Sequence, residues 1–123
     1  MRRVAILLTL ATLVGACGAP SSVSKQAEAL ASTAAEGALL AGDVADARST
    51  GAFAKTHARA LLEQAEEVRA ASASPELGSL AGEIVSALRQ LASAPTDRVV
   101  ASEVEERLET AAKDAEEIEE SAA

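Results

Sequence analysis

The sequence predicts an all-α protein: a small antiparallel up-down bundle of about four amphipathic helices that follows a cleaved signal peptide. Apolar and small side chains recur every three or four residues through residues 25–123, and no segment alternates with a period of two. Residues 17–123 contain 28 alanines, and alanine is the best helix former. Short breaks between the helices favour antiparallel neighbours. An alternative is two helical hairpins that open or dimerise, because a core lined by alanine buries modest apolar area.

We expect the first helix between Lys25 and about Ala47. Gly37 and Gly42 weaken this helix by roughly 1 kcal/mol each relative to alanine. We therefore expect these glycines to allow the close approach of a neighbouring helix. The inward stripe of the first helix consists of Val23, Ala27, Leu30, Ala34, Gly37, Ala41 and Val44.

The second helix is expected between about Ala52 and Ala71, with Ser49 or Thr50 as its cap. The third begins at Ser74-Pro75-Glu76, which combines a capping serine, proline at the first helical position and an acid in the first turn. Pro95-Thr96-Asp97 opens the fourth. The inward sets are Phe53, Ala54, His57, Ala58, Leu61, Ala65 and Val68 in the second helix; Leu77, Leu80, Ile84, Leu88 and Leu91 in the third; and Val100, Val104, Leu108, Ala111, Ala115 and Ile118 in the fourth.

The charge of the chain excludes one class of partner. The chain has 19 acidic and 11 basic residues, a formal net charge of −8, and cleavage that removes Arg2 and Arg3 makes the product two units more negative. Such a surface is not expected to bind nucleic acid, because that binding depends on Lys and Arg neutralising phosphates. Anionic lipid headgroups are repelled as well.

The first residues have the pattern of an export signal. Arg2 and Arg3 precede an apolar run of eleven residues from Val4 to Val14. A membrane span needs about 20 apolar residues, so this run is short for one. The run ends at the small residues Gly15 and Ala16, directly before the single cysteine of the chain, Cys17.

Val14, Gly15, Ala16 and Cys17 resemble the lipobox of bacterial lipoproteins. The resemblance implies that the Cys17 thiol receives a diacylglyceryl group and that residues 1–16 are then removed as a signal peptide. Val14 stands where leucine is commonest in the lipobox, and Gly15 where alanine or serine is. Ordinary secretion with cleavage near Ala19, or an uncleaved anchor, are the alternatives.

This interpretation divides the chain into a signal peptide (1–16), a lipidated cysteine with its tether (17–24) and a helical domain (25–123). The seven residues of the tether after Cys17 reach roughly 25 Å at most. Two or more acyl chains anchor a protein stably, so the lipid on Cys17 is expected to attach it to the membrane without help from the acidic domain. Gly18 is not the aspartate that retains many lipoproteins in an inner membrane. The expected location is therefore the outer membrane or the outer face of the cell membrane of a bacterium.

The candidate chemical groups are few. His57 is the only histidine, and it is interpreted either as a structural residue or as a contact to a small ligand. Metal sites of helical bundles use several carboxylates with Glu-x-x-His spacing, and the residue three before His57 is alanine. We therefore expect no metal and no cofactor. No Ser-His-Asp signature is present, so we expect no enzyme.

Two features suggest surfaces for interaction. The run Glu116-Glu117-Ile118-Glu119-Glu120 is interpreted as a solubilising acidic tail, or as a docking strip for a basic partner or loosely bound divalent cations. Leu39, Leu40 and Leu62 are candidates for a second apolar surface. The expected function is that of a membrane-anchored, non-enzymatic envelope lipoprotein of structural or interaction type, with an envelope protein as partner. The alternative is a tethered bundle that binds a small ligand or metal, and the oligomeric state stays open.

Overall fold

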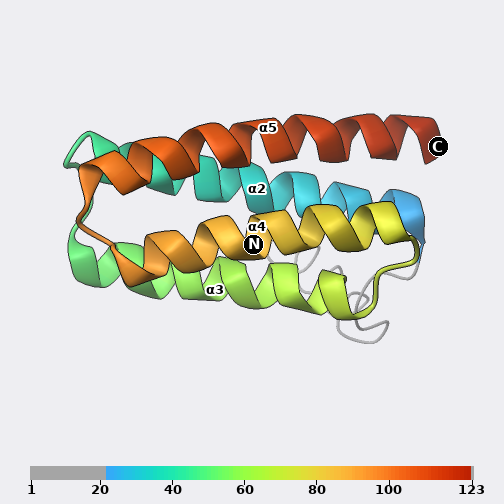
Figure 1. Cartoon of the computed structure of the whole chain (residues 1–123), viewed down its shortest axis with the longest axis horizontal. Helices are drawn as coiled ribbons and strands as arrows, with labels where there is room; N and C mark the ends of the chain where they lie inside the picture. Colours follow the sequence, from blue (N-terminus) through green and yellow to red (C-terminus); the bar gives the residue numbers. More distant parts are fainter. Residues whose placement is uncertain (1–21, 123) are drawn as a thin grey trace, which may run out of the picture.

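The computed structural model describes residues 22–122 and places them in four α-helices. These are α2 (Val23–Ala45), α3 (Gly51–Ala70), α4 (Pro75–Ser93) and α5 (Arg98–Ala122). Successive helices run in opposite directions, so the described chain forms an up-down bundle (Figure 1). The predicted fold class is confirmed, and the ends expected for the first two helices lie within two residues of those observed.

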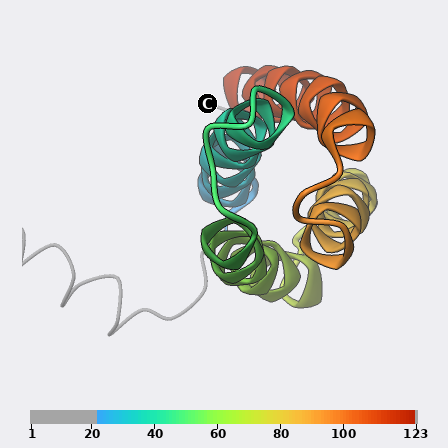
Figure 2. The ribbon, with the colours of Figure 1, turned by 90° about the vertical axis from the view of Figure 1, so that its left-hand side faces the viewer.

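The helices form a ring in which each neighbours the next, and α5 returns to lie beside α2 (Figure 2). The most extensive contacts are between α2 and α5 and between α3 and α4, whereas α4 and α5 touch each other less. The packing of α2 on α5 joins the first and last helices and therefore holds the two hairpins together as one bundle. The α4–α5 seam carries a groove, described below.

Small residues bring α2 close to α5. A methyl group added at Gly37 would lie 2.8 Å from Cδ1 of Leu108 and 3.0 Å from Cδ2 of Leu88. A methyl group at Gly42 would lie 2.7 Å from Oε2 of Glu105, which is also on α5. Gly37 therefore occupies a position at which buried side chains leave little room for a methyl group, as expected from the sequence, whereas at Gly42 only the flexible end of Glu105 lies that close.

Each helix begins at a side-chain oxygen that accepts a hydrogen bond from the backbone N–H three residues further on. This bond satisfies one of the N–H groups that an α-helix leaves unpaired at its start. At the fourth helix the same carboxylate oxygen also accepts from the N–H two residues on. The four residues are Ser22, Thr50, Ser74 and Asp97. The start signals at Ser74 and Asp97 are thus confirmed, and Thr50 caps α3.

The core consists of the predicted inward stripes with few exceptions. All five predicted inward side chains of α4 are buried, as are most of those in the other helices. Phe53 is the clear error, because its side chain is 58% exposed. It precedes the fully buried Ala54, and neighbouring helical residues point about 100° apart, so one of the two must leave the core. His57, Val23, Val100 and Ile118 lie at the edge of the core and are partly buried.

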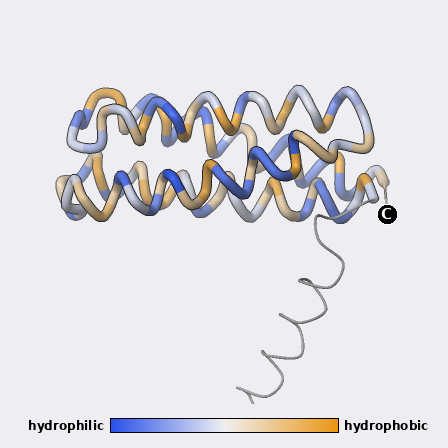
Figure 3. The backbone as a smooth tube through the Cα atoms, turned by 90° about the horizontal axis from the view of Figure 1, so that it is seen from below, coloured by the Kyte–Doolittle hydropathy of each residue, from blue (hydrophilic) through white to orange (hydrophobic). Residues whose placement is uncertain are grey.

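The hydropathy of the described helices fits a bundle with one buried face per helix. Hydrophilic and hydrophobic residues are interspersed along each of them (Figure 3). Within residues 22–122, no helix combines the length and the apolar character needed to cross a bilayer.

The corner between α2 and α3 contains the single non-glycine residue with a positive φ among residues 22–122, Ala47 at 58°. The N–H of Arg48 donates to the carbonyl of Asp43 at 2.7 Å, and the N–H of Ala47 donates to that of Val44 at 3.0 Å. This pair of bonds is the Schellman arrangement, in which the left-handed position is usually glycine. The guanidinium of Arg98 adds a bond from Nε to the carbonyl of Ala45 at 2.8 Å.

Candidate functional site

The four residues that resemble a lipobox, Val14, Gly15, Ala16 and Cys17, lie outside the described residues. The described chain begins at Ser22, which caps α2 and follows Cys17 by five residues. The start of α2, the end of α5 and the α3–α4 loop all lie at the same end of the bundle (Figure 1). A lipid on Cys17 would therefore be attached at this end, which we call the tether end.

His57 lies at the surface where α3 meets α2, and not in the core. Its side chain is 32% exposed, and Nε2 is 3.4 Å from Oε2 of Glu36. The ring packs edge-on against Phe53, with 5.4 Å between the ring centroids. Nδ1 is buried and has no hydrogen-bond partner among residues 22–122. The arrangement pairs one histidine with one carboxylate, and the described part of the chain holds no group of three or more side chains able to bind a metal ion.

The predicted second apolar surface is wrong. Leu39 is 72% exposed, but Leu40 is buried in the core, and Leu62 is partly buried against the core. Leu39 and Leu40 are consecutive in a helix and point about 100° apart, so they cannot share a face. The large apolar side chains that are exposed in the described part of the chain are Leu39, Phe53 and Val99.

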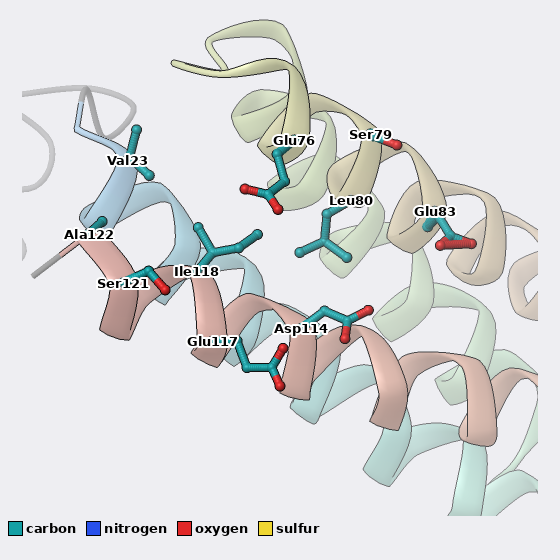
Figure 4. Close-up of a pocket in the computed structure, with 10 residues that line it drawn as sticks. All are labelled: Val23, Glu76, Ser79, Leu80, Glu83, Asp114, Glu117, Ile118, Ser121 and Ala122. Carbon is teal, nitrogen blue, oxygen red and sulfur yellow. The ribbon is translucent and has the colours of Figure 1, made fainter.

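A groove of about 620 Å³ opens between α4 and α5 at the tether end (Figure 4). Leu80 of α4 and Ile118 of α5 point toward one another across it, and Val23 lies at its end. Leu80 is almost completely buried, whereas Ile118 and Val23 are partly exposed. The floor of the groove is therefore apolar and open to solvent on one side. The complete lining is Val23, Glu76, Ser79, Leu80, Glu83, Asp114, Glu117, Ile118, Ser121 and Ala122.

The groove continues along the α4–α5 seam into a second hollow of about 310 Å³, which shares Glu83 and Asp114 with the first. Arg107 lies in this second hollow and connects the two helices. Its Nη1 donates to Oε1 of Gln90 at 3.0 Å, and its Nη2 contacts Oγ of Ser86 at 3.5 Å. Arg107 therefore closes the end of the groove that lies away from the tether.

The walls of the groove are acidic. The first hollow is lined by four carboxylates, from Glu76, Glu83, Asp114 and Glu117. All four are exposed, and within the described range 22–122 none forms an ion pair. The carbonyl groups at the end of α5 add partial negative charge, because a helix carries about half a unit of negative charge at its C-terminus. The result is an apolar floor between two unneutralised acidic walls.

The sequence contained only part of the signal for this groove. The run from Glu116 to Glu120 suggested a docking strip, and in the structure Glu117 and Ile118 of that run do line the groove. The opposite wall could not be recognised, because Glu76 and Glu83 resemble any solvated residues of an amphipathic helix. Their significance depends on how closely α4 and α5 pack, which periodicity does not determine.

Residues 22–122 thus form an up-down bundle of four helices, with an acidic, apolar-floored groove along the α4–α5 seam. No protein-family model, curated protein or solved structure matches the chain.

Proposed function

We propose that this protein is a lipid-anchored, exported helical bundle of a bacterial cell envelope, which acts by binding another envelope component and not by catalysis. The observation that carries the proposal is the position of the lipobox cysteine relative to the bundle. Five residues from Cys17 to the cap at Ser22 span at most roughly 18 Å. A lipid on Cys17 would hold the tether end of the bundle next to the bilayer surface.

The acidic net charge of the domain supports membrane attachment through acyl chains alone, without electrostatic attraction to the lipids. The chain has a formal net charge of −8, so its net charge provides no attraction for anionic headgroups. Two or three acyl chains bury enough methylene groups, at about 0.8 kcal/mol each, to anchor a protein without a basic patch. Cys17 is the only cysteine of the chain and therefore the only residue able to form the thioether.

A binding role is favoured over catalysis by the chemistry that the bundle presents. The groove offers apolar contacts and carboxylates, and these recognise a partner by burial and charge. The one histidine lies between α2 and α3 and is absent from the groove lining. The carboxylates of the groove therefore have no imidazole beside them among the lining residues.

The test compares the full chain with two variants, Cys17→Ala and the matched control Ser21→Ala, in a bacterial host that processes lipoproteins. We expect radiolabelled palmitate on the parent and on the Ser21 variant but none on the Cys17 variant. Mass spectrometry of the mature N-terminal peptide should begin at Cys17 with a diacylglyceryl mass added. Cleavage after Ala19, or an intact residue 1–16 segment in the membrane fraction, would overturn the proposal.

A second candidate function, the binding of a small ligand or metal at His57, is favoured by one observation, the buried and unpaired Nδ1. The probes are Zn²⁺, Ni²⁺ and haem, added to the purified chain during thermal unfolding. A ligand that binds only the native state raises Tm with increasing concentration. A rise that disappears in His57→Ala and persists in the neighbouring Thr56→Ala supports this candidate, and an unchanged Tm with all three probes rejects it.

A further inference from the structure

We propose that the α4–α5 groove receives a basic amphipathic helix, supplied by the membrane-adjacent segment of another envelope protein. The location next to the membrane rests on the proposed function, but the chemistry of the groove does not. Three features of the described residues carry the inference: the apolar floor, the unpaired carboxylates and the position of the open end.

The floor of the groove suits the apolar face of a helix. Leu80 and Ile118 face each other across the seam, and Val23 extends this apolar strip to the tether end. The two hollows share a wall and follow the direction of α4 and α5, so an elongated partner fits them better than a compact one. Amphipathic helices bind in this way, with an apolar stripe laid into a groove between two helices.

The walls determine the charge of the partner. Glu76 and Glu83 on α4 are seven residues apart, about 10.5 Å along the helix axis. Asp114 and Glu117 stand one turn apart on the opposite wall. Because none of these carboxylates has an ion-pair partner among the residues described, a helix with Lys or Arg on both sides of its apolar stripe would neutralise them. Complementary charge of this kind accelerates association and selects against other partners.

The same charges argue against other occupants. A second copy of the chain that docked groove to groove would bring the same acidic walls together, and like charges across an interface are strongly unfavourable. An anionic lipid surface is repelled for the same reason. A bound metal ion is not supported, since no three ligating side chains of the described helices converge.

The position of the groove selects a partner near the membrane. The lining includes Val23, the first residue of α2, and Ala122, the last residue of α5. Cys17 precedes Val23 by six residues, so a lipid there places the open end of the groove within roughly 20 Å of the bilayer. Arg107 closes the other end. A basic segment that emerges from a membrane would therefore meet the groove at its open end.

The inference is tested with the protein as it is purified from cells that express the full chain, with whatever processing those cells carry out. The protein is kept in neutral detergent and titrated with an 18-residue helical peptide of leucine and lysine. The measurement is Kd by isothermal calorimetry, with a leucine–glutamate peptide as the negative control. The groove variant is Glu83→Lys with Asp114→Lys. The matched control is Glu63→Lys with Glu67→Lys on the exposed face of α3, which changes the net charge equally.

We expect the groove variant to weaken binding at least 10-fold and the α3 variant less than 3-fold. In NMR spectra of the isotope-labelled parent, the backbone amide signals that shift on addition of the peptide should be centred on Leu80 and Ile118. Equal weakening in both variants would reduce the effect to net charge and overturn the inference. So would a dimer in sedimentation equilibrium that the groove variant abolishes, because the occupant would then be a second copy. Circular dichroism of both variants must match the parent before the comparison is made. The result does not depend on lipidation, so failure of the anchor and failure of the groove are separate outcomes.

Discussion

The carboxamide of Gln26, in the first turn of α2, closes the loop between α3 and α4 by bonding the backbone of Ala71. Nε2 of Gln26 donates to the carbonyl of Ala71 at 2.7 Å, and Oε1 accepts from the N–H of Ala73 at 2.8 Å. Gln26 is fully buried, although it belongs to a polar residue type. These bonds connect the beginning of the bundle to a loop 45 residues further along the chain.

Replacing Gln26 should therefore destabilise the bundle. Two hydrogen bonds of about 0.5–1.5 kcal/mol each are lost in Gln26→Ala, so the free energy of unfolding should fall by about 2 kcal/mol. For a domain of this size, that loss lowers Tm by roughly 10 °C. The measurement is urea denaturation followed by circular dichroism. Gln90→Ala is the control, because exposed Gln90 bonds only the surface residue Arg107, and its effect should be below about 0.5 kcal/mol.

A titratable carboxyl in place of the Gln26 carboxamide should make the loss of stability depend on pH. Gln26→Glu places a carboxyl in a fully buried site and next to the carbonyl of Ala71, and both effects raise its pKa in the folded state. The loss of stability relative to the parent should be complete above that raised pKa. It should shrink as pH falls toward about 4.3, the unfolded value, because the protonated carboxyl can again donate to Ala71. A loss of stability that stays constant between pH 8 and pH 4 would contradict a buried side chain at position 26 that bonds the α3–α4 loop.

Much of this fold follows from local sequence, and the exceptions have identifiable causes. Ser74-Pro75 and Asp97 predicted helix starts because capping needs only neighbouring residues. Gln26 was not recognised, since its partners are backbone atoms of a distant loop. Helical periodicity predicts an inward position for Phe53 because it borders the stripe of α3, but the adjacent Ala54 fills the core position and Phe53 is exposed.

The groove could be predicted only in part, for a related reason. Periodicity assigns Leu80 and Ile118 to inward faces, and both do contribute to the seam. It does not say that α4 and α5 make fewer contacts than α2 and α5, or that Ile118 stays partly exposed at their seam. Gly37 marks one point of close approach, because a methyl group there would meet both Leu108 of α5 and Leu88 of α4.

The close approach at Gly37 predicts opposite effects for two glycine-to-alanine changes. In Gly37→Ala the new methyl group meets Leu108 and Leu88, both fully buried, at 3.0 Å or less. Overpacking of a core costs about 1–3 kcal/mol and exceeds the gain of about 1 kcal/mol in helix propensity. In Gly82→Ala the nearest atom, Nε of Arg69, is at 3.9 Å, an ordinary contact. We expect Gly37→Ala to lose about 1 kcal/mol and Gly82→Ala to gain about 0.5–1 kcal/mol in urea titrations. A gain at both positions would show that α5 can move away from α2.

The left-handed residue Ala47 predicts a stabilising change at the α2–α3 corner. An alanine at a φ of 58° is strained, whereas glycine adopts that conformation freely. Ala47→Gly should raise the free energy of unfolding by about 0.5–1 kcal/mol, after the greater chain entropy of glycine in the unfolded state is deducted. The control, Ala60→Gly, lies on the exposed face of α3 and should lose about 1 kcal/mol. Destabilisation in both variants would mean that the corner does not hold Ala47 in the left-handed region.

The positive charge of Arg107 should weaken the binding of a basic helix at the end of the groove where Arg107 lies. Its guanidinium is the cationic group of the second hollow and lies among carboxylates that a partner would otherwise neutralise. Arg107→Gln removes this charge, so the leucine–lysine peptide should bind about 3-fold to 10-fold more tightly at low salt, with less difference at high salt. Arg59→Gln on α3 removes the same charge away from the groove and should change Kd less than 2-fold.

Stability should change by less than about 0.5 kcal/mol in either variant, since both side chains are exposed. Equal tightening by the two variants would assign the effect to net charge, and unchanged affinity in Arg107→Gln would show that the bound helix does not reach the second hollow.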